Sequence, residues 1–218
     1  MRITNAGFTV ILPYGTWGEA REALYAMIER AGRTCYKSED RITPQSAEKF
    51  VRQMVKSGHE AMLEHAGLTV RFVVDRGVSH ELVRHRMASF AQESTRYCNY
   101  GSNKFDGELT FIRPFYLDAC EPEVEQVWRA AMQACEDAYL TMLKSGCSPQ
   151  EARAVLPNSL KTEVVMTANM REWRHFLKLR ALGTTGKPHP QMYEVAYPLL
   201  MELRTRLPAI FDDLEVAK

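Results

Sequence analysis

The densest group of side chains able to bind an anion lies in residues 81–97. This segment, ELVRHRMASFAQESTRY, holds three arginines, a histidine and several hydroxyl side chains. Arginine presents a planar fork of donors that matches phosphate or carboxylate, and serine hydroxyls can complete such a site. An isolated Arg-His-Arg run is more often the solvated end of a helix. The serine and the arginine that follow at fixed distance favour a site for a small phosphorylated ligand.

The composition is that of an ordinary globular protein. The 218 residues are 45% hydrophobic and 25% charged, which fits a single domain over 1–218 with a substantial core. The formal net charge of +1 gives no global field that would attract nucleic acid or an anionic membrane. Five cysteines without a CxxC pair, no signal-peptide pattern and no membrane-spanning apolar run predict a cytoplasmic protein.

Hydrophobic periodicity predicts a chain that contains both strands and helices. The predicted strands cover residues 2–12, 66–75, 109–115 and 160–168. The predicted helices cover residues 17–31, 44–56, 80–86, 121–145, 149–156, 170–182 and 191–206. In the helix over 121–145, one apolar stripe is expected to lie in the core: Val124, Trp128, Ala131, Cys135, Ala138, Tyr139 and Met142.

Several residues are expected to mark helix ends. Gly32 would stop the first long helix, because glycine commonly follows the last helical residue. Short polar side chains accept hydrogen bonds from the first backbone N–H groups of a helix. The expected caps of this kind are Thr43, Ser79, Ser148 and Asn169.

Two histidines and two glutamates in residues 59–65 suggest a metal site at first sight. A helical zinc site needs histidines four residues apart on one face. His59 and His65 are six apart, and His80 and His85 are five apart. We therefore expect no metal site.

Four segments, in order, resemble a known enzyme family. Arg84, His85 and Arg86, then seven residues and Ser94, resemble the RHR-x7-S signature of the flavin-dependent thymidylate synthases. The segment GHEAMLEH before it, and EARAVLP and TANMREWRHFLKLR after it, are similar to further blocks of that family. The resemblance covers residues 32–197 and implies the fold of this family, a mixed α and β domain of the α+β class with a sheet flanked by helices.

The resemblance implies an enzyme that converts dUMP to dTMP. Methylenetetrahydrofolate would donate the carbon, NADPH would supply reducing power, and FAD would carry the hydride, with no protein thiol as nucleophile. The family further implies a homotetramer with active sites shared between subunits, acting on small molecules without a nucleic-acid or membrane partner.

The resemblance also implies a role for each residue that matches a family motif. The residues expected to contact FAD are His59, Arg84, His85, Arg86, Gln92, Asn169, Arg171 and His175. Those expected to bind dUMP are Glu81, Arg84, Glu93, Ser94, Arg96, Arg153 and Arg180. Arg180 is the catalytic candidate, because a cation facing N3 would stabilise the anionic uracil ring.

Two choices stay open within this assignment. The family often has the pattern Asn-Glu-x directly before the serine, where this chain has Ala91-Gln92-Glu93. Either Gln92 or Glu93 could therefore face the pyrimidine. Of Arg171 and Arg174, one is expected to be functional and the other solvated, and position favours Arg171.

Two other classes of function are weighed against the synthase. A nucleotide hydrolase or phosphatase would need a cluster of carboxylates around a metal, which is not evident in the sequence. A non-catalytic RNA-binding module could use the arginine and tyrosines of residues 96–100 to bind a single strand, but the near-neutral net charge disfavours it.

Overall fold

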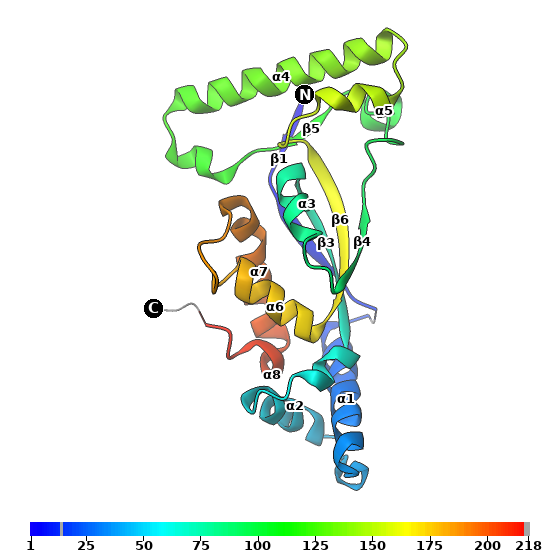
Figure 1. The fold of residues 1–218 in the computed structure, drawn as a ribbon, viewed down its shortest axis with the longest axis vertical. Helices are drawn as coiled ribbons and strands as arrows, with labels where there is room; N and C mark the ends of the chain where they lie inside the picture. Colours follow the sequence, from blue (N-terminus) through cyan, green and yellow to red (C-terminus); the bar gives the residue numbers. More distant parts are fainter. Residues whose placement is uncertain (14, 216–218) are drawn as a thin grey trace. The chain divides into compact units, whose positions relative to one another are not determined.

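The computed structural model describes residues 1–13 and 15–215. The chain forms two compact units (Figure 1). The first unit contains Met1–Gly7, Phe72–Arg84 and Ala91–Val165. The second contains Phe8–Arg71, His85–Phe90 and the chain from Met166 onward. Among the described residues, no helix has the length and apolar character needed to span a bilayer.

The strands form two sheets. The larger has the order β2 (Gly7–Ile11), β3 (Gly67–Asp75), β6 (Lys161–Asn169) and β4 (Ala88–Gln92). The smaller pairs β1 (Arg2–Thr4) in parallel with β5 (Thr110–Ile112), with Ile3 opposite Phe111. The predicted strand over 2–12 is thus two strands in different sheets, while the strands predicted over 66–75 and 160–168 are confirmed.

Strands β3 and β6 each continue directly into a helix. Asp75 ends β3, and its Oδ1 accepts a hydrogen bond from the Val78 N–H at 2.7 Å at the start of α3 (Arg76–Leu82). Asn169 ends β6, and its Oδ1 accepts from the Glu172 N–H at 2.9 Å at the start of α6 (Met170–Arg180). Both residues suit this capping position. The Asn169 prediction is confirmed, but Ser79 lies buried inside α3 and Asp75 caps that helix instead.

Two helix ends in the second unit differ from the prediction. Helix α1 (Trp17–Tyr36) continues past Gly32, and Lys37 with φ of 47° occupies the left-handed position after its end. A Cβ on Gly32 would lie 2.5 Å from Cζ of Phe50 on α2 (Ser46–Lys56), so glycine permits the close approach of α1 and α2. Gln45, not Thr43, occupies the N-cap position of α2.

The helices and strands of the second unit enclose a core of apolar side chains. Its remaining helices are α7 (Pro190–Arg206) and α8 (Pro208–Phe211), with 3-10 helices η1 (Glu39–Arg41) and η2 (Ala61–His65). Contacts join α1 to α2, α2 to α8, and α6 to α7. The largest fully buried side chains of this core include Ile28, Leu63, Leu68, Trp173, Phe176 and Phe211.

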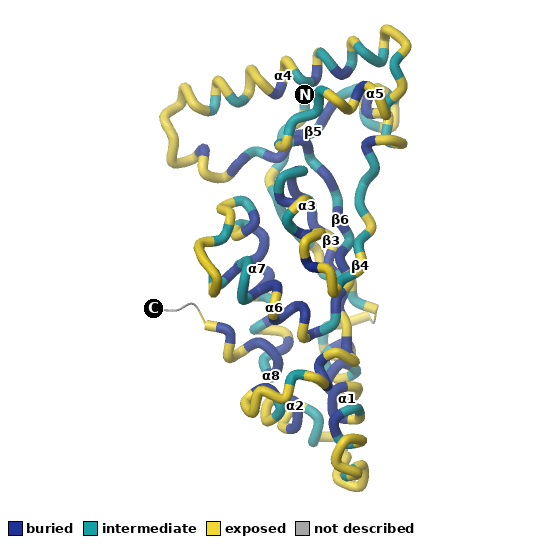
Figure 2. Tube along the Cα trace, in the orientation of Figure 1, coloured by how far each residue is buried: buried dark blue, intermediate teal, exposed yellow. Residues whose placement is uncertain are grey.

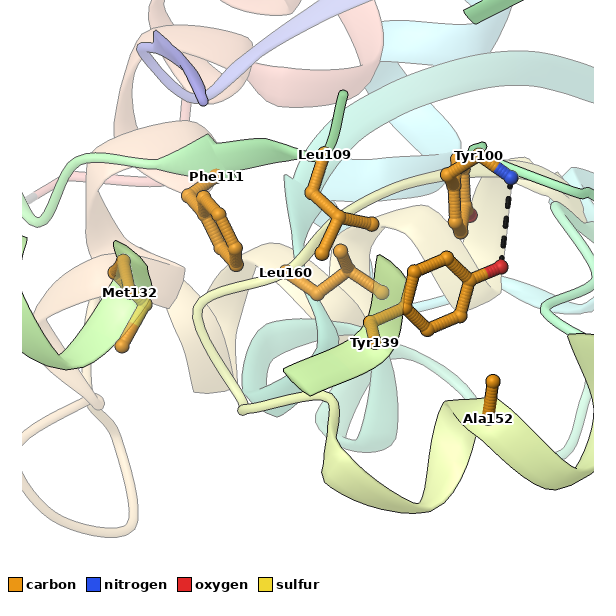
Figure 3. Packing of buried hydrophobic residues seen from close by; sticks show 7 residues of the cluster. All are labelled: Tyr100, Leu109, Phe111, Met132, Tyr139, Ala152 and Leu160. Carbon is orange, nitrogen blue, oxygen red and sulfur yellow. Dashed lines mark hydrogen bonds between the residues drawn. The ribbon is translucent and has the colours of Figure 1, made fainter. Parts of the chain in front are cut away.

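The first unit packs α4 (Pro122–Lys144) and α5 (Pro149–Ala152) over a separate apolar cluster. Its 3-10 helices are η3 (Asn103–Phe105), η4 (Phe115–Ala119) and η5 (Arg153–Val155). In this cluster, the Tyr139 hydroxyl accepts a hydrogen bond from the Tyr100 N–H at 3.4 Å (Figure 3). Ser148 occupies the N-cap position of α5 as predicted, and its backbone N–H and hydroxyl donate to Oε2 of Glu151 at 2.8 and 2.7 Å.

Helix α4 is less buried than its predicted apolar stripe requires. Tyr139 is fully buried, and Met132 is 6% exposed. Val124, which the prediction placed in the core, is 45% exposed, and Figure 2 shows α4 exposed along much of its length. The stripe is therefore only partly a core face.

Candidate functional site

The residues predicted to bind ligands divide between the two units. The first unit holds Glu81, Arg84, Gln92, Glu93, Ser94, Arg96 and Arg153. The second holds His59, His85, Arg86, Asn169, Arg171, His175 and Arg180. The boundary passes through the signature, between its first arginine and its histidine, so each unit presents its own group of candidate residues.

The Arg-His-Arg run lies after α3 and not inside a helix. Helix α3 begins at the Asp75 cap and ends at Leu82, so the predicted helix over 80–86 is wrong in its second half. The chain then turns before entering β4. Arg84 and Arg86 are exposed, whereas the side chain of His85 is buried.

His85 is hydrogen-bonded at both ring nitrogens. Its Nδ1 lies 3.0 Å from Oε1 of Glu172, and its Nε2 accepts from Nε of Arg180 at 3.2 Å. A guanidinium only donates, so Nε2 carries the lone pair and Nδ1 carries the proton. The His85 ring also packs edge-on against Phe176, with ring centroids 4.9 Å apart.

The surroundings of His85 favour its neutral form. Burial lowers the pKa of His85, and the nearby charges of Arg180 and His175 act in the same direction. The hydrogen bond and charge of Glu172 oppose this shift but do not reverse it. The imidazole is therefore uncharged at neutral pH.

His85, Glu172 and His175 offer possible ligand atoms within 4.8 Å of one another. Both ring nitrogens of His85 already take part in hydrogen bonds, and a guanidinium occupies the side of Nε2 where an ion would bind. A metal would have to displace Arg180 or Glu172 from the histidine. The contacts thus favour a hydrogen-bonded network over a metal centre.

A cavity of about 360 Å³ lies beside α6. Its lining residues are Glu60, Glu64, Met87, Asn169, Arg171, Glu172, His175 and Lys178. Three of them, Asn169, Arg171 and His175, are among the residues predicted to contact FAD. Arg171 and His175 are four residues apart on α6 and so share one helix face.

Arg171 and Arg174 have opposite environments. Arg171 is half exposed at the cavity and pairs with Glu64 at 2.5 Å. Arg174 is 2% exposed, and its Nε donates to Oε1 of Glu60 at 2.9 Å. Arg174 is therefore buried and paired, contrary to the expectation of solvation, and Arg171 is the one that lines the cavity.

His59 and Arg86 are exposed residues of the second unit, and neither lines the cavity beside α6. His59 follows α2, where its N–H donates to the carbonyl of Met54 at 2.9 Å. The contacts of the second unit therefore bring Asn169, Arg171 and His175 together at the cavity, and His85 and Arg180 together beside it.

In the first unit, Gln92 and Glu93 are both bonded to protein groups. Nε2 of Gln92 donates to the hydroxyls of Ser79 at 2.9 Å and Thr162 at 3.3 Å. Glu93 accepts from the Tyr100 hydroxyl at 2.8 Å and from Nζ of Lys161 at 3.0 Å. Consecutive residues near the end of a strand point to different sides, and these partners lie in different directions accordingly.

The turn at Ser94 is tied to α5 and η5. The Ser94 hydroxyl accepts from the Arg96 N–H at 3.3 Å, and Nε of Arg96 donates to Oε1 of Gln150 at 2.8 Å. Nη1 of Arg153 donates to the Thr95 hydroxyl at 3.4 Å. Both arginines are exposed, and these bonds place their guanidinium groups at the same turn. Glu81 is partly buried near the end of α3, where its carbonyl accepts from the Arg84 N–H at 3.3 Å.

Several residues of these networks were not predicted from the sequence. Glu172 orients His85, and Lys161 and Tyr100 hold Glu93. Burial of Tyr100 and the adjacent charge of Glu93 raise the pKa of the tyrosine, so its hydroxyl remains a donor. Glu172 gave one usable signal: it is the acidic residue in a helix segment otherwise rich in basic residues.

Both groups of candidate residues contain exposed arginines, and the turn at Ser94 also presents hydroxyls. Together with the mixed α and β fold, they define an anion-binding protein. Residues 22–209 match the family model described as thymidylate synthase complementing protein. The chain belongs to this family.

Individual relatives agree with the family match. A flavin-dependent thymidylate synthase of Corynebacterium glutamicum is 33% identical, covering 92% of this chain and 83% of its own length. The protein of the same name from Geobacter sulfurreducens is 33% identical, covering 86% of this chain and 81% of its own length. The crystal structure of the UMP/dUMP methylase PolB from Streptomyces cacaoi, bound with 5-Br dUMP, has the same fold, with a TM-score of 0.76. It is 22% identical and covers 97% of this chain and 96% of that chain.

Proposed function

We propose that this chain is a flavin-dependent thymidylate synthase that methylates dUMP to dTMP. The observation that carries the proposal is the turn at Ser94, where hydrogen bonds hold Arg96 and Arg153 close to one another. The match to the family model gives this turn its expected role. The relatives that span most of the chain bear the name of this activity.

The turn at Ser94 would bind the phosphate of dUMP. A nucleotide monophosphate is close to dianionic at neutral pH, and guanidinium groups are its strongest side-chain partners. The bonds of Arg96 to Gln150 and of Arg153 to Thr95 reduce the freedom of both arginines before the ligand arrives. Glu81, Arg84 and Glu93 complete the proposed set of dUMP residues.

The cavity beside α6 fits part of a flavin nucleotide. Its volume of about 360 Å³ lies in the usual range for ligand pockets. Arg171 stands in the first turn of α6, where the helix dipole and the backbone N–H groups also favour an anion such as a pyrophosphate. The residues proposed to hold FAD are His59, Arg84, Arg86, Gln92, Asn169, Arg171 and His175.

FAD, when bound, supplies the hydride chemistry, and the chain supplies orientation and charge. Arg180 would place its cation at N3 of the uracil ring, stabilise the anionic form of the ring and so make C5 a better nucleophile. No protein thiol is needed for this step. We further propose methylenetetrahydrofolate as the carbon donor, NADPH as the reductant, a cytoplasmic location and a homotetramer with shared active sites.

The test is dTMP formation by the purified protein supplied with FAD, dUMP, methylenetetrahydrofolate and NADPH. We expect a flavin absorption spectrum, product formation, and loss of most of the turnover in Arg180→Ala. Arg129→Ala is the matched control, because Arg129 is an exposed arginine on α4 paired with Glu125. Protein that takes up no flavin and forms no dTMP would refute the proposal.

A further inference from the structure

Glu172, His85 and Arg180 form a continuous chain of hydrogen bonds within the second unit. On α6, Glu172, Phe176 and Arg180 are spaced four residues apart. The His85 ring packs on Phe176, the middle residue, and bonds to the outer two through its opposite nitrogens. The histidine thus joins both ends of the helix through one rigid ring.

We propose that His85 is a positioning residue, which Glu172 orients so that its Nε2 fixes the guanidinium plane of Arg180 at the substrate. The proposal rests on the proposed function, because it takes Arg180 to act on the substrate. It assigns the His85 ring to Arg180 in place of direct contact with FAD. His85 is 5% exposed, and a bond from its ring to a flavin would require breaking one of its two bonds to the protein.

The planarity of the guanidinium makes this anchoring effective. Nε, Cζ and both Nη atoms of arginine lie in one plane, so holding the Nε–H of Arg180 restricts the rotation of the whole group. A lysine or an unanchored arginine would present the same charge without that direction.

Glu172 selects the tautomer that the anchoring needs. Its carboxylate accepts the Nδ1 proton, which leaves a lone pair on Nε2 for Arg180. The backbone N–H of Glu172 donates to Oδ1 of Asn169, so the start of the helix holds the carboxylate in place. With a proton on Nε2, the ring would present a second donor to Arg180, and the bond would be lost.

Protonation of His85 should therefore release Arg180. The charged groups that face the ring are Glu172, Arg180 and His175, whose ring centroid lies 5.9 Å away. Glu172 raises the pKa of His85 through its hydrogen bond and its charge, so Glu172→Gln should lower this pKa further. The acid limb of the pH profile should then move to lower pH in Glu172→Gln and vanish in His85→Gln.

A double-mutant cycle on the FAD-loaded enzyme tests the coupling. We expect His85→Gln to lower kcat/KM for dUMP about 100-fold while flavin content is unchanged, as for a misplaced catalytic group. In the Arg180→Lys background the same change should lower kcat/KM by less than about 2-fold, because the anchored group is gone. His80→Gln is the matched control, since His80 is an exposed histidine on α3, and it should leave kcat/KM unchanged. An equal fold-loss of kcat/KM from His85→Gln in the native and Arg180→Lys backgrounds would overturn the proposal.

A second readout needs no turnover. Histidine-selective 15N NMR of the full chain should show His85 as the neutral Nδ1–H tautomer at neutral pH, with its signals changed in Glu172→Gln. An Nε2–H tautomer or a charged His85 in an active enzyme would overturn the positioning role alone. Native protein that forms no dTMP would instead refute the proposed function.

Discussion

Arg174 and Asp213 form a bidentate ion pair, in which Nη1 and Nη2 of the arginine each lie 2.6 Å from a carboxylate oxygen of the aspartate. Nη1 of Arg174 also donates to the carbonyl of Ile210, and Nε donates to Glu60. These bonds join α6 to α8 and the segment that follows it, and to the residue just before η2. One buried guanidinium therefore links three separate parts of the second unit.

Removal of this guanidinium should destabilise the protein strongly. The Arg174 side chain is 2% exposed but that of Asp213 is 49% exposed, so the cost should lie at the lower end of the roughly 3–5 kcal/mol typical of breaking a buried ion pair from one side. We expect the free energy of unfolding of Arg174→Ala, measured by urea titration, to fall by about that amount. Arg171→Ala is the control on the same helix, because the Arg171–Glu64 pair is 53% and 47% exposed and should contribute about 1 kcal/mol or less. Equal losses in the two variants would contradict the structural role of Arg174.

The same pair predicts a pH dependence of stability. Burial raises the pKa of Asp213, but the hydrogen bonds and charge of Arg174 outweigh it and hold the pKa below the usual 3.8. Because the folded pKa is the lower one, the stabilisation is present above pH 3.8 and is lost as the pH falls through the folded pKa. Unfolding free energies of native protein and Asp213→Asn should thus differ at neutral pH and converge in acid. If the difference in unfolding free energy between native protein and Asp213→Asn stayed constant into acid, the pH dependence could not come from Asp213.

Arg171→Ala should weaken flavin binding without unfolding the protein. A charge-assisted hydrogen bond contributes about 1.5–3 kcal/mol, which corresponds to roughly a 10-fold to 100-fold rise in the dissociation constant for FAD. Fluorescence titration of the apoprotein with FAD measures this dissociation constant. Arg41→Ala, at an exposed arginine of η1 that lines no part of the cavity beside α6, should bind FAD as the native protein does. Unchanged affinity in Arg171→Ala would remove this residue from the proposed flavin site.

Gly32→Ala tests the close approach of α1 and α2. Alanine normally stabilises a helix relative to glycine by about 1 kcal/mol. At residue 32 its Cβ would lie 2.5 Å from the Phe50 ring, so we expect a net loss of about 1–3 kcal/mol from overpacking. Gly18→Ala on the same helix is the control, because its nearest neighbour would be the Thr16 hydroxyl at 3.8 Å, and it should not destabilise. Thermal unfolding of both variants shows whether each substitution raises or lowers the stability of the protein.

Local sequence chemistry predicted the elements whose causes are local. Alternating apolar residues predict β3, the strand-like segment 160–168 predicts β6, and Asn169 is predictable as a cap because its side chain acts three residues away. Asp75 was overlooked for the same role, although a short polar residue at a strand end was an equivalent signal.

The parts that the sequence did not predict depend on distant contacts. Nothing near Arg174 in the chain indicates its burial, because Asp213 lies 39 residues away. The partner of His85, Glu172, lies 87 residues away. The division of residues 2–12 into two strands likewise follows from pairing of β1 with β5, which the segment itself cannot encode. The residue types of the candidate site could therefore be predicted, but the bonds that orient them could not.

The direct passage of β6 into α6 at Asn169 has a consequence for how this chain can change in length. An inserted or deleted residue at that junction would rotate the following helix by about 100° and carry Arg171 and His175 away from the cavity. The segment 181–189, which lies between α6 and α7, imposes no such register. Length variants selected for function should accumulate in that segment and be absent at the Asn169 junction.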